Sequence, residues 1–272
     1  MYPAYSVLLS VYKSEKAKWL SIAIDSMYAQ TVKPSEVVLV QDGPLTDDLN
    51  SIISQYKIKY PDSFKTIALQ KNMGLGLALH YGVLACSNEY IARMDTDDYS
   101  IPTRIEEEFN AMFDKKVDMV GSIIYEFIES IDNVVSHRML PETTDQIYNF
   151  AKKRTPIAHP SVLFKKSQII ACGNYEDCYL VEDFAIFVNL LRLGAKGYNV
   201  QKPLVYMRVS EDFYKRRGGW KYLKAMLKFN VKLLKQGWFR KRDFLIRSTM
   251  NSIVCLMPNS IRNFVYKKML RK

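Results

Sequence analysis

The chain is poor in cysteine and histidine, and it has no long apolar run. Its 272 residues include four cysteines and three histidines. No CxxC spacing occurs, which argues against a zinc site or a disulfide framework and fits buried thiols in a reducing cytosol (Cys86, Cys172, Cys178 and Cys255). No stretch approaches the roughly 20 apolar residues of a spanning helix. The first residues lack a basic segment before a strand-length apolar run, so we predict no signal peptide.

Two common phosphate-binding motifs are also missing. The sequence contains no GxxxxGK[ST], which excludes a P-loop. It contains no GxGxxG after its first apolar segment, which weakens a dinucleotide-binding interpretation.

Positive charge is concentrated at the C-terminal end. The net charge is +11, yet residues 212–272 hold 17 bases and two acids, a balance of +15. Residues 1–211 hold 22 bases and 26 acids, a balance of −4. We therefore expect a slightly acidic body over 1–211 and a separate basic extension over 212–272.

Strand-like and helix-like segments alternate through the first hundred residues. Continuous apolar runs predict strands at 5–11, 36–42, 65–70 and 89–94. Between them we expect helices, including one at 16–30 and one that begins with Asn72 as its cap. Pro102 fits the first position of a helix over 103–113. This rhythm predicts an α/β fold with a mostly parallel, Rossmann-like central sheet flanked by helices.

The second half is expected to be mixed. We predict strands near 117–129, 157–167 and 202–209, and a helix at 181–195.

Polar side chains follow every strand of the first half. Ligands of open parallel sheets bind beyond the carboxyl ends of the strands, which is where these residues fall: Ser10, Tyr12, Lys13, Asp42, Asn72, Asp95, Asp97 and Asp98. The DTDD segment brings three carboxylates together, and like charges this close need a positive partner. Carboxylate oxygens suit hard cations such as Mg²⁺ or Mn²⁺, which bridge to phosphate oxygens.

These segments, in their order, resemble an inverting glycosyltransferase of family 2 with the GT-A fold, of the kind that builds bacterial O-antigen, capsular or exopolysaccharide repeat units. The resemblance spans about Tyr5 to Val209 and rests on "SVLLSVYKSE", "VLVQDG", "NMGLGLAL", "YIARMDTDDYSIPTRIE", "IAHPSVLFKKS" and "VEDFAIFVNLLRLG". It implies a nucleotide-binding half at 1–100 and an acceptor and catalytic half at 101–211. Gln41 departs from the pattern, since the family often has a second Asp there.

The resemblance also implies roles for single residues. Ser10, Tyr12 and Lys13 lie in the loop that contacts the nucleotide, with Asn72 among the substrate-binding residues. Asp42 matches the carboxylate that accepts the N3–H of uracil, and Asp95 lies near the ribose and diphosphate. Asp97, with Asp95, matches the Mn²⁺ or Mg²⁺ ligands. Asp183 matches the catalytic base, beside Glu182; a simple charge at a helix N-terminus is the alternative for both.

Three further residues have two interpretations each. His159 either lines the acceptor pocket, as in relatives with AHP, or is a satisfied loop histidine. Arg208 and Arg217 either close on the diphosphate with the "KRRGG" loop (215–219) or belong to a solvated basic turn.

The basic extension begins with an amphipathic pattern. Lysines recur at three- and four-residue spacing on one face, and apolar residues lie on another (Lys221, Lys224, Lys228, Lys232 and Lys235; Tyr222, Met226, Phe229 and Leu233). One hypothesis is peripheral attachment to the anionic inner face of the bacterial plasma membrane, which gives a cytoplasmic, membrane-associated protein. The alternative is that the apolar face packs on the body. No groove-reading motif supports a nucleic-acid partner.

The predicted activity is metal-dependent, inverting transfer of a hexose from UDP-Gal or UDP-Glc to a HexNAc linked through diphosphate to a polyprenyl lipid. We expect a β-linkage and take β-1,3 as the first choice. The alternatives are a phosphatase or a nucleotidyltransferase on a similar sheet, or an inactive transferase-like scaffold. A dehalogenase-type phosphatase needs a DGT-like continuation after its DxD, whereas Asp98-Tyr99-Ser100 stands here. A nucleotidyltransferase needs a glycine-rich signature after the first strand, which "SVYKSE" lacks.

Overall fold

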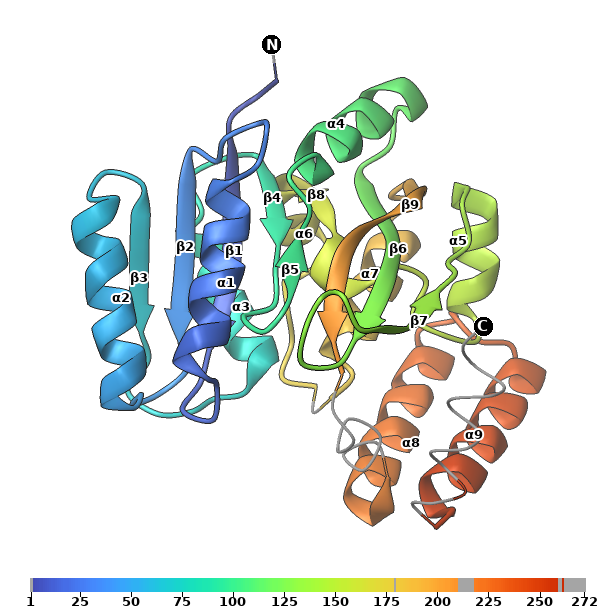
Figure 1. Cartoon of the computed structure of the whole chain (residues 1–272). Helices are drawn as coiled ribbons and strands as arrows, with labels where there is room; N and C mark the ends of the chain where they lie inside the picture. The colour runs from blue at the N-terminus through green and yellow to red at the C-terminus, as the bar shows by residue number, and fades with distance from the viewer. Residues whose placement is uncertain (1, 179, 210–217, 259–260, 262–272) are drawn as a thin grey trace.

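One twisted sheet, covered by helices on both faces, forms the body of the protein, and a helical hairpin lies beside it (Figure 1). The computed structural model describes residues 2–178, 180–209, 218–258 and 261. The expected boundary at 211/212 and Arg217 lie outside these ranges.

The first half of the sheet is parallel, as predicted. The order is β3-β2-β1-β4, and each neighbouring pair is parallel (β1, Tyr5–Val11; β2, Glu36–Gln41; β3, Phe64–Ala68; β4, Tyr90–Arg93). The carboxyl ends of all four strands therefore meet at one edge, which brings the predicted polar residues together.

The second half of the sheet is mixed. β8 (Leu163–Lys165) is antiparallel to both β4 and β6 (Met119–Phe127), so β6 runs in the same direction as β4. β9 (Gly197–Arg208) pairs in parallel with β6. Two short strands that the sequence pattern did not predict, β5 (Tyr99–Ser100) and β7 (Val134–Arg138), add antiparallel edges. The expected α/β architecture is confirmed, and the antiparallel pairs begin at β8, beside β4.

Side chains of each strand alternate between two apolar layers. Leu8, Val38 and Val40 pack toward α3 (Leu75–Ala85) and α7 (Glu182–Arg192). Their neighbours Val7 and Leu39 face the opposite layer, which contains α1, α2 and α4 (Ala17–Tyr28, Asp47–Lys59 and Arg104–Lys115). Two shorter helices, α5 (Thr144–Ala151) and α6 (Lys166–Ala171), complete the body. Strands buried on both faces explain the continuous apolar runs.

Two predicted helix starts are wrong by a few residues. α3 begins after Gly74, because the Asn72 amide donates to the Asp42 carbonyl oxygen at 3.3 Å instead of capping the helix. α4 begins at Arg104 with Thr103 as its cap residue, so Pro102 precedes the cap. Local hydrogen-bonding alternatives of this kind compete with caps.

The basic extension folds into a hairpin of α8 (Gly219–Lys235) and α9 (Lys241–Leu256). The apolar face of α8 is buried, and Phe229 lies edge-on to Phe184 of α7 with ring centroids 5.7 Å apart. Lys232 forms an ion pair with Glu176 of the body. For α8, the described contacts therefore favour packing on the body. Among the described residues, no helix has the length and apolar character to cross a membrane.

Candidate active site

The three carboxylates of the DTDD segment converge just beyond the end of β4. Asp95, Asp97 and Asp98 each offer an oxygen within 4.8 Å of the others. Burial raises the pKa of Asp97 to about 7, and the negative charges of Asp95 and Glu15 add to the shift. Burial, together with the charges of Asp97 and Asp95, raises the pKa of Asp98 well above its usual value. This cluster is short of positive charge.

A buried arginine supplies part of the missing positive charge. The sequence analysis did not identify this residue. Arg93, the last residue of β4, is 1% exposed and forms an ion pair with Asp95. Its Nε and Nη1 atoms are buried without a hydrogen-bond partner among the described residues. The charge of Arg93 also acts on His159 and Tyr175. The sequence did contain one indication of this role, because an arginine at the carboxyl end of a buried strand stands just before three acids.

A second buried arginine holds the end of β4 in place. Arg104 of α4 donates to the Arg93 carbonyl oxygen at 2.9 Å and pairs with Glu108 at 2.9 Å. Both side chains of that pair are fully buried. A buried ion pair with further hydrogen bonds restricts geometry more than it adds stability, so we assign Arg104 to positioning the DTDD segment.

Arg208 closes the segment from the side of β9. Its backbone N–H donates to Asp98 Oδ1 at 2.8 Å, and its Nε donates to the Asp97 carbonyl oxygen at 3.0 Å. Its Nη1 donates to the Glu129 carbonyl oxygen at 2.8 Å. The guanidinium lies 4.5 Å from the ring centre of Trp19, a cation–π contact. Arg208 is thus part of the wall of the site.

Asp42 fixes the loop that enters α3. It is 4% exposed, and its two oxygens accept the backbone N–H groups of Met73 at 2.6 Å and Gly74 at 3.0 Å. Gly43 is required beside it, because φ is +87° and a Cβ would lie 2.5 Å from the Asn72 nitrogen. These bonds leave one lone pair on each oxygen, so contact with a uracil edge stays a prediction.

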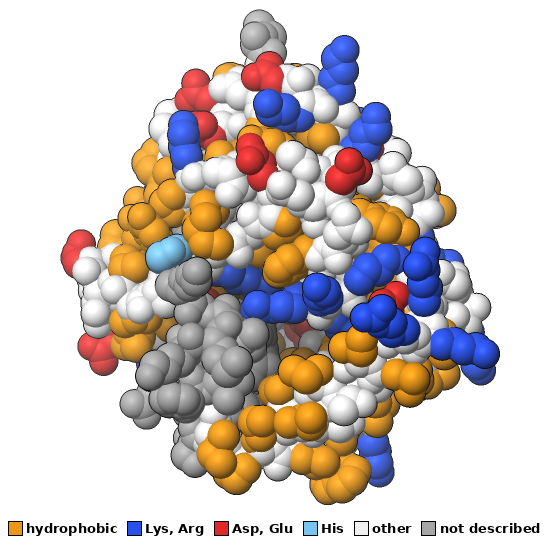
Figure 2. All heavy atoms as spheres, turned by 90° about the vertical axis from the view of Figure 1, so that its right-hand side faces the viewer, with side chains coloured by type: hydrophobic (Ala, Val, Ile, Leu, Met, Phe, Trp, Pro, Cys, Tyr) orange, Lys and Arg blue, Asp and Glu red, His pale blue; other side chains and the backbone are white. Residues whose placement is uncertain are grey.

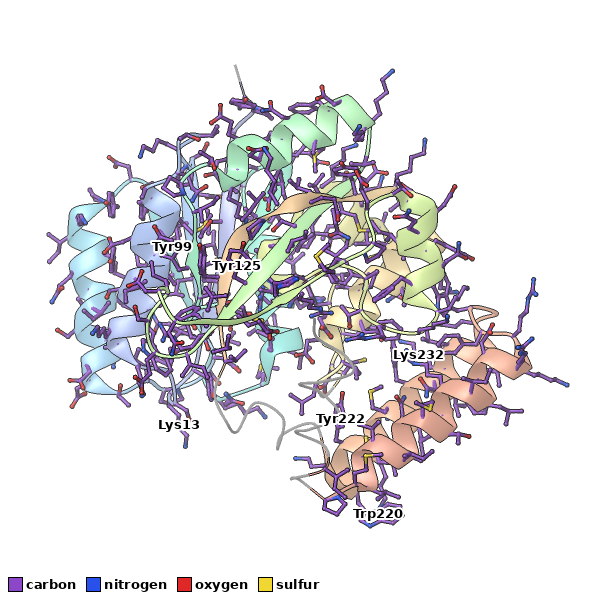
Figure 3. All side chains as sticks on the ribbon, turned by 45° about the vertical axis from the view of Figure 1, so that its right-hand side comes forward. Lys13, Tyr99, Tyr125, Trp220, Tyr222 and Lys232 are labelled. Carbon is purple, nitrogen blue, oxygen red and sulfur yellow. The ribbon has the colours of Figure 1, made fainter. Side chains whose placement is uncertain are left out.

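The loop after β1 contributes an acid that the sequence did not single out. Thr96 Oγ1 donates to Glu15 Oε2 at 2.8 Å and to the Ser10 carbonyl oxygen at 3.5 Å. Tyr12 and Lys13 are exposed, and Lys13 projects outward from this edge (Figure 3). The predicted nucleotide loop therefore borders the carboxylate cluster.

Glu182 and Asp183 open α7, where the helix dipole favours negative charge. Burial raises the pKa of Glu182 to about 7, and the negative charges of Asp183 and Asp95 add to this shift. The charge of Asp95 in the DTDD segment therefore acts on the start of α7. Asp183 Oδ1 accepts the Phe184 N–H at 2.6 Å. Gly76 allows α3 to lie close to the segment before α7, because a Cβ at this position would lie 2.3 Å from the Glu176 carbonyl oxygen.

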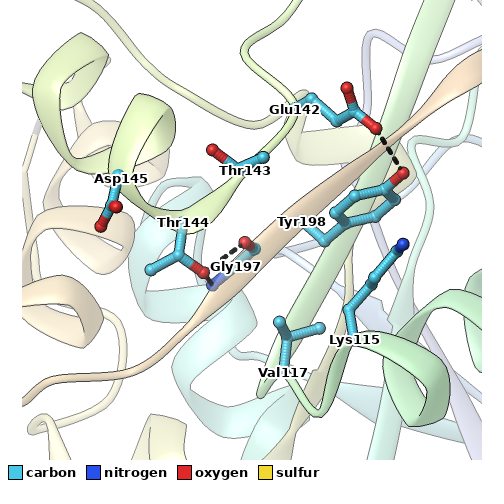
Figure 4. A pocket seen from close by; sticks show the side chains of 8 residues that line it. All are labelled: Lys115, Val117, Glu142, Thr143, Thr144, Asp145, Gly197 and Tyr198. Atoms are coloured by element: carbon cyan, nitrogen blue, oxygen red, sulfur yellow. Dashed lines mark hydrogen bonds between the residues drawn. The ribbon is translucent and has the colours of Figure 1, made fainter.

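A cavity of about 340 Å³ lies elsewhere (Figure 4). It is bordered by Val117, Gly197 and the start of α5, at the amino ends of β6 and β9. Because β6 runs parallel to β4, this cavity is at the edge of the sheet opposite the carboxylates. Its Tyr198 hydroxyl donates to Glu142 at 2.7 Å.

Comparison with known proteins identifies this arrangement. Residues 6–169 match the family described as "Glycosyl transferase family 2". The chain belongs to this family. An enzyme of Escherichia coli named "UDP-Gal:alpha-D-GlcNAc-diphosphoundecaprenol beta-1,3-galactosyltransferase" is 35% identical over 99% of this chain and 98% of its own length. The amylovoran biosynthesis glycosyltransferase AmsE of Erwinia amylovora is 32% identical over 97% of this chain and 98% of its own.

Solved structures confirm the GT-A fold. Staphylococcus aureus TarS 1–349 in complex with UDP-GlcNAc has a TM-score of 0.66 and 18% identity, covering 85% of this chain and 67% of its own. The Pyrobaculum calidifontis mannosyltransferase PcManGT in complex with GDP-Man and Mn²⁺ has a TM-score of 0.64 and 15% identity, covering 96% and 72%. This family 2 chain is therefore a glycosyltransferase by fold and by sequence.

The residues present fit a divalent cation. The Asp97 carboxylate accepts no hydrogen bond from another residue that the structure describes, and Asp98 Oδ2 is buried without a partner there. Unpaired carboxylate oxygens in a repulsive cluster suit Mg²⁺ and Mn²⁺, and of these two residues Asp97 has the carboxylate that is open for this role.

His159 is buried against Tyr175 and Phe187. It is 7% exposed, and its Nε2 lies 2.8 Å from the Tyr175 hydroxyl oxygen. This contact satisfies one ring nitrogen, and lining of an acceptor pocket stays a prediction. Burial lowers the pKa of His159 well below its usual value, and the charge of Arg93 adds to the shift.

The His159 shift predicts acid destabilisation. As the pH falls below about 6.5, the unfolded chain binds a proton at His159 that the folded chain does not bind. The free energy of unfolding is therefore highest well above pH 6.5 and decreases as the pH falls. Between pH 7.5 and 5.5 the loss is on the order of 1 kcal/mol. Urea unfolding of wild type and His159→Gln at both pH values checks this. Between pH 7.5 and 5.5, His159→Gln should lose less unfolding free energy than wild type, by the amount assigned to His159. An equal loss in both proteins would contradict this assignment.

Proposed function

We propose that this protein transfers galactose from UDP-galactose to an N-acetylglucosamine linked through diphosphate to a polyprenyl lipid, forming a β-1,3 bond. The product is an intermediate of surface polysaccharide assembly. The observation that carries this proposal is the 35% identity, along nearly the whole of both chains, to an enzyme whose name states that reaction. A lipid-linked acceptor also implies action at the cytoplasmic face of a membrane, and this location is part of the proposal.

The proposed chemistry is a single displacement. The acceptor hydroxyl gives its proton to the Asp183 carboxylate as its oxygen attacks the anomeric carbon. The bond from that carbon to the diphosphate oxygen breaks, and UDP leaves with the bonding electrons. Attack from the face opposite the leaving group converts the α-linked donor sugar into a β-linked product. The position of Asp183 in the first turn of α7 supports this role, because a helix N-terminus favours a nearby negative charge.

The remaining residues bind and orient. Asp97, with Asp95, would hold the divalent cation, which when bound supplies positive charge to the diphosphate oxygens. Asp42 and Asn72 would contact the nucleotide beside the loop of Ser10, Tyr12 and Lys13. On the acceptor side we place Glu182 and His159. Arg208 would steady the DTDD segment, and Arg217 would contact the diphosphate.

A donor panel tests the proposal. Purified protein is incubated with Mn²⁺, a synthetic GlcNAc-diphosphate-lipid, and in turn UDP-galactose, UDP-glucose and UDP-N-acetylglucosamine, and product is measured by mass spectrometry. We expect hexose transfer with UDP-galactose as the best donor. Chelation should reduce the rate by about 100-fold or more, and added Mn²⁺ should restore it. Turnover unaffected by the chelator would contradict the metal role, and preference for another donor would contradict the sugar assignment.

A further inference from the structure

The hairpin presents a second apolar face that the body does not use. In α8, Met226, Phe229 and Leu233 point inward and join the main core. In α9, Phe244 packs against this core, but other large apolar residues point outward, with Leu245 62%, Ile246 54% and Met250 55% exposed. Ile253 and Leu256 are about half exposed, at 47% and 49%. A face this apolar is uncommon on a soluble surface.

These five residues form one stripe, with the uncharged, exposed Thr249 among them. At 100° per residue they fall within roughly 140° of the circumference of α9. From Phe244 to Met257 the only charged residue is Arg247, and it is buried, 9% exposed. Its Nε donates to Asn230 Oδ1 at 3.0 Å, and a second nitrogen bonds to the Lys153 carbonyl oxygen. The outer face of α9 therefore carries no charge over about four turns.

Basic side chains lie along one border of the stripe. Arg240, Lys241 and Arg242 precede or begin α9 and are exposed, as is Lys153 at the end of α5. Figure 2 shows hydrophobic side chains gathered over the lower part of this face, below a band of Lys and Arg. At the far end of the hairpin, Trp220 is 66% exposed (Figure 3). Tryptophan and basic residues around an apolar stripe are typical of helices that lie in the membrane interface.

We propose that the outer face of α9 docks the protein on an anionic membrane surface. Its apolar stripe enters the headgroup region, while the bases at its N-terminal end meet lipid phosphates. A second copy of the chain fits less well, because its stripe from Phe244 to Met257 has no acidic residue to pair with these bases. This surface replaces the lysine face of α8 as the site of attachment.

The position of α9 fits the proposed lipid acceptor. The Arg247 guanidinium lies 4.2 Å from the ring centre of Phe184, the residue after Asp183. The docking helix α9 therefore contacts the residue next to the proposed base. The proposal deepens the proposed function, since it names how the enzyme meets a lipid-linked substrate, and it is tested separately from catalysis.

Vesicle flotation of the full chain tests the surface. Vesicles of phosphatidylcholine alone are compared with vesicles of one-third phosphatidylglycerol. We expect binding to the anionic vesicles, weakened by salt. The double variant Leu245→Glu/Ile253→Glu should lower partitioning by about tenfold or more, and Lys241→Gln and Arg242→Gln by roughly fivefold each. Ile58→Glu, at an apolar residue of α2 that is 81% exposed, is the matched control and should bind like wild type.

Transfer to a short-chain, water-soluble acceptor separates docking from catalysis. The double variant should retain this activity while it loses vesicle binding. Absence of wild-type binding, or equal binding by the double variant, would overturn the docking surface even if transfer is intact. A wild-type dimer in light scattering that the double variant abolishes would also overturn it, because the stripe would then join two copies.

Discussion

Asp183→Asn is expected to slow glycosyl transfer by between about 100-fold and 10,000-fold, the range that a positioned base contributes. Asparagine keeps the size of the side chain and an acceptor for the Phe184 N–H, but it cannot take a proton from the acceptor hydroxyl. The loss should fall on kcat, since the carboxylate acts on the proton that moves in the transition state. Steady-state transfer rates at saturating donor check this.

Two neighbours serve as controls for Asp183. Asp177 lies exposed ahead of α7, and Asp177→Asn should leave the rate unchanged. Glu182→Gln removes the other carboxylate at the start of α7. Near-normal activity of Asp183→Asn together with a large loss in Glu182→Gln would move the base to Glu182.

Within the DTDD segment, Asp97→Asn and Asp98→Asn are expected to differ sharply. Asp97→Asn removes the carboxylate assigned to the cation, so transfer should fall by about 100-fold or more. Asp98→Asn retains an oxygen for the Arg208 N–H, so its rate should stay within about tenfold of wild type. Transfer rates across a Mn²⁺ titration check both, with the Mn²⁺ requirement raised only in Asp97→Asn. Equal losses in the two variants would instead make Asp98 a third ligand.

The location of the site was predictable because parallel strands place their carboxyl ends together. The strands were recognisable from apolar runs, and polar residues followed each of them. Asp42, Asp95 and Asp97 therefore fell at one edge without knowledge of any contact. Asp183 was reachable only through the resemblance, because periodicity locates its helix but not its distance from β4.

The contacts that complete the site depend on tertiary structure and were not predictable. Arg93 lies only two residues before Asp95, but the sequence does not say whether a charged side chain at the end of a buried strand turns toward that carboxylate or toward water. Arg93 therefore supplies part of the positive charge that the three acids need, and the proposed divalent cation would supply the rest. Asp42 was assigned to the nucleotide, yet its oxygens also hold the backbone of Met73 and Gly74, about thirty residues away. Long-range bonds of this kind leave no periodic signal.

The hairpin shows the same limit. The amphipathic pattern of α8 was correctly recognised, but a pattern does not say whether the apolar face meets the body or a membrane. In the fold, the α8 face is buried against α7 and the exposed apolar face belongs to α9, whose sequence has a weaker pattern.

The most direct measurement of the central claim is the anomeric configuration of the sugar that this enzyme transfers. The product formed from UDP-α-galactose and the GlcNAc-diphosphate-lipid is purified, and the coupling at its new anomeric proton is measured by NMR. Single displacement with Asp183 as base predicts a β-linked galactose. An α-linked product would contradict this account, because retention requires a mechanism that the proposed displacement does not contain.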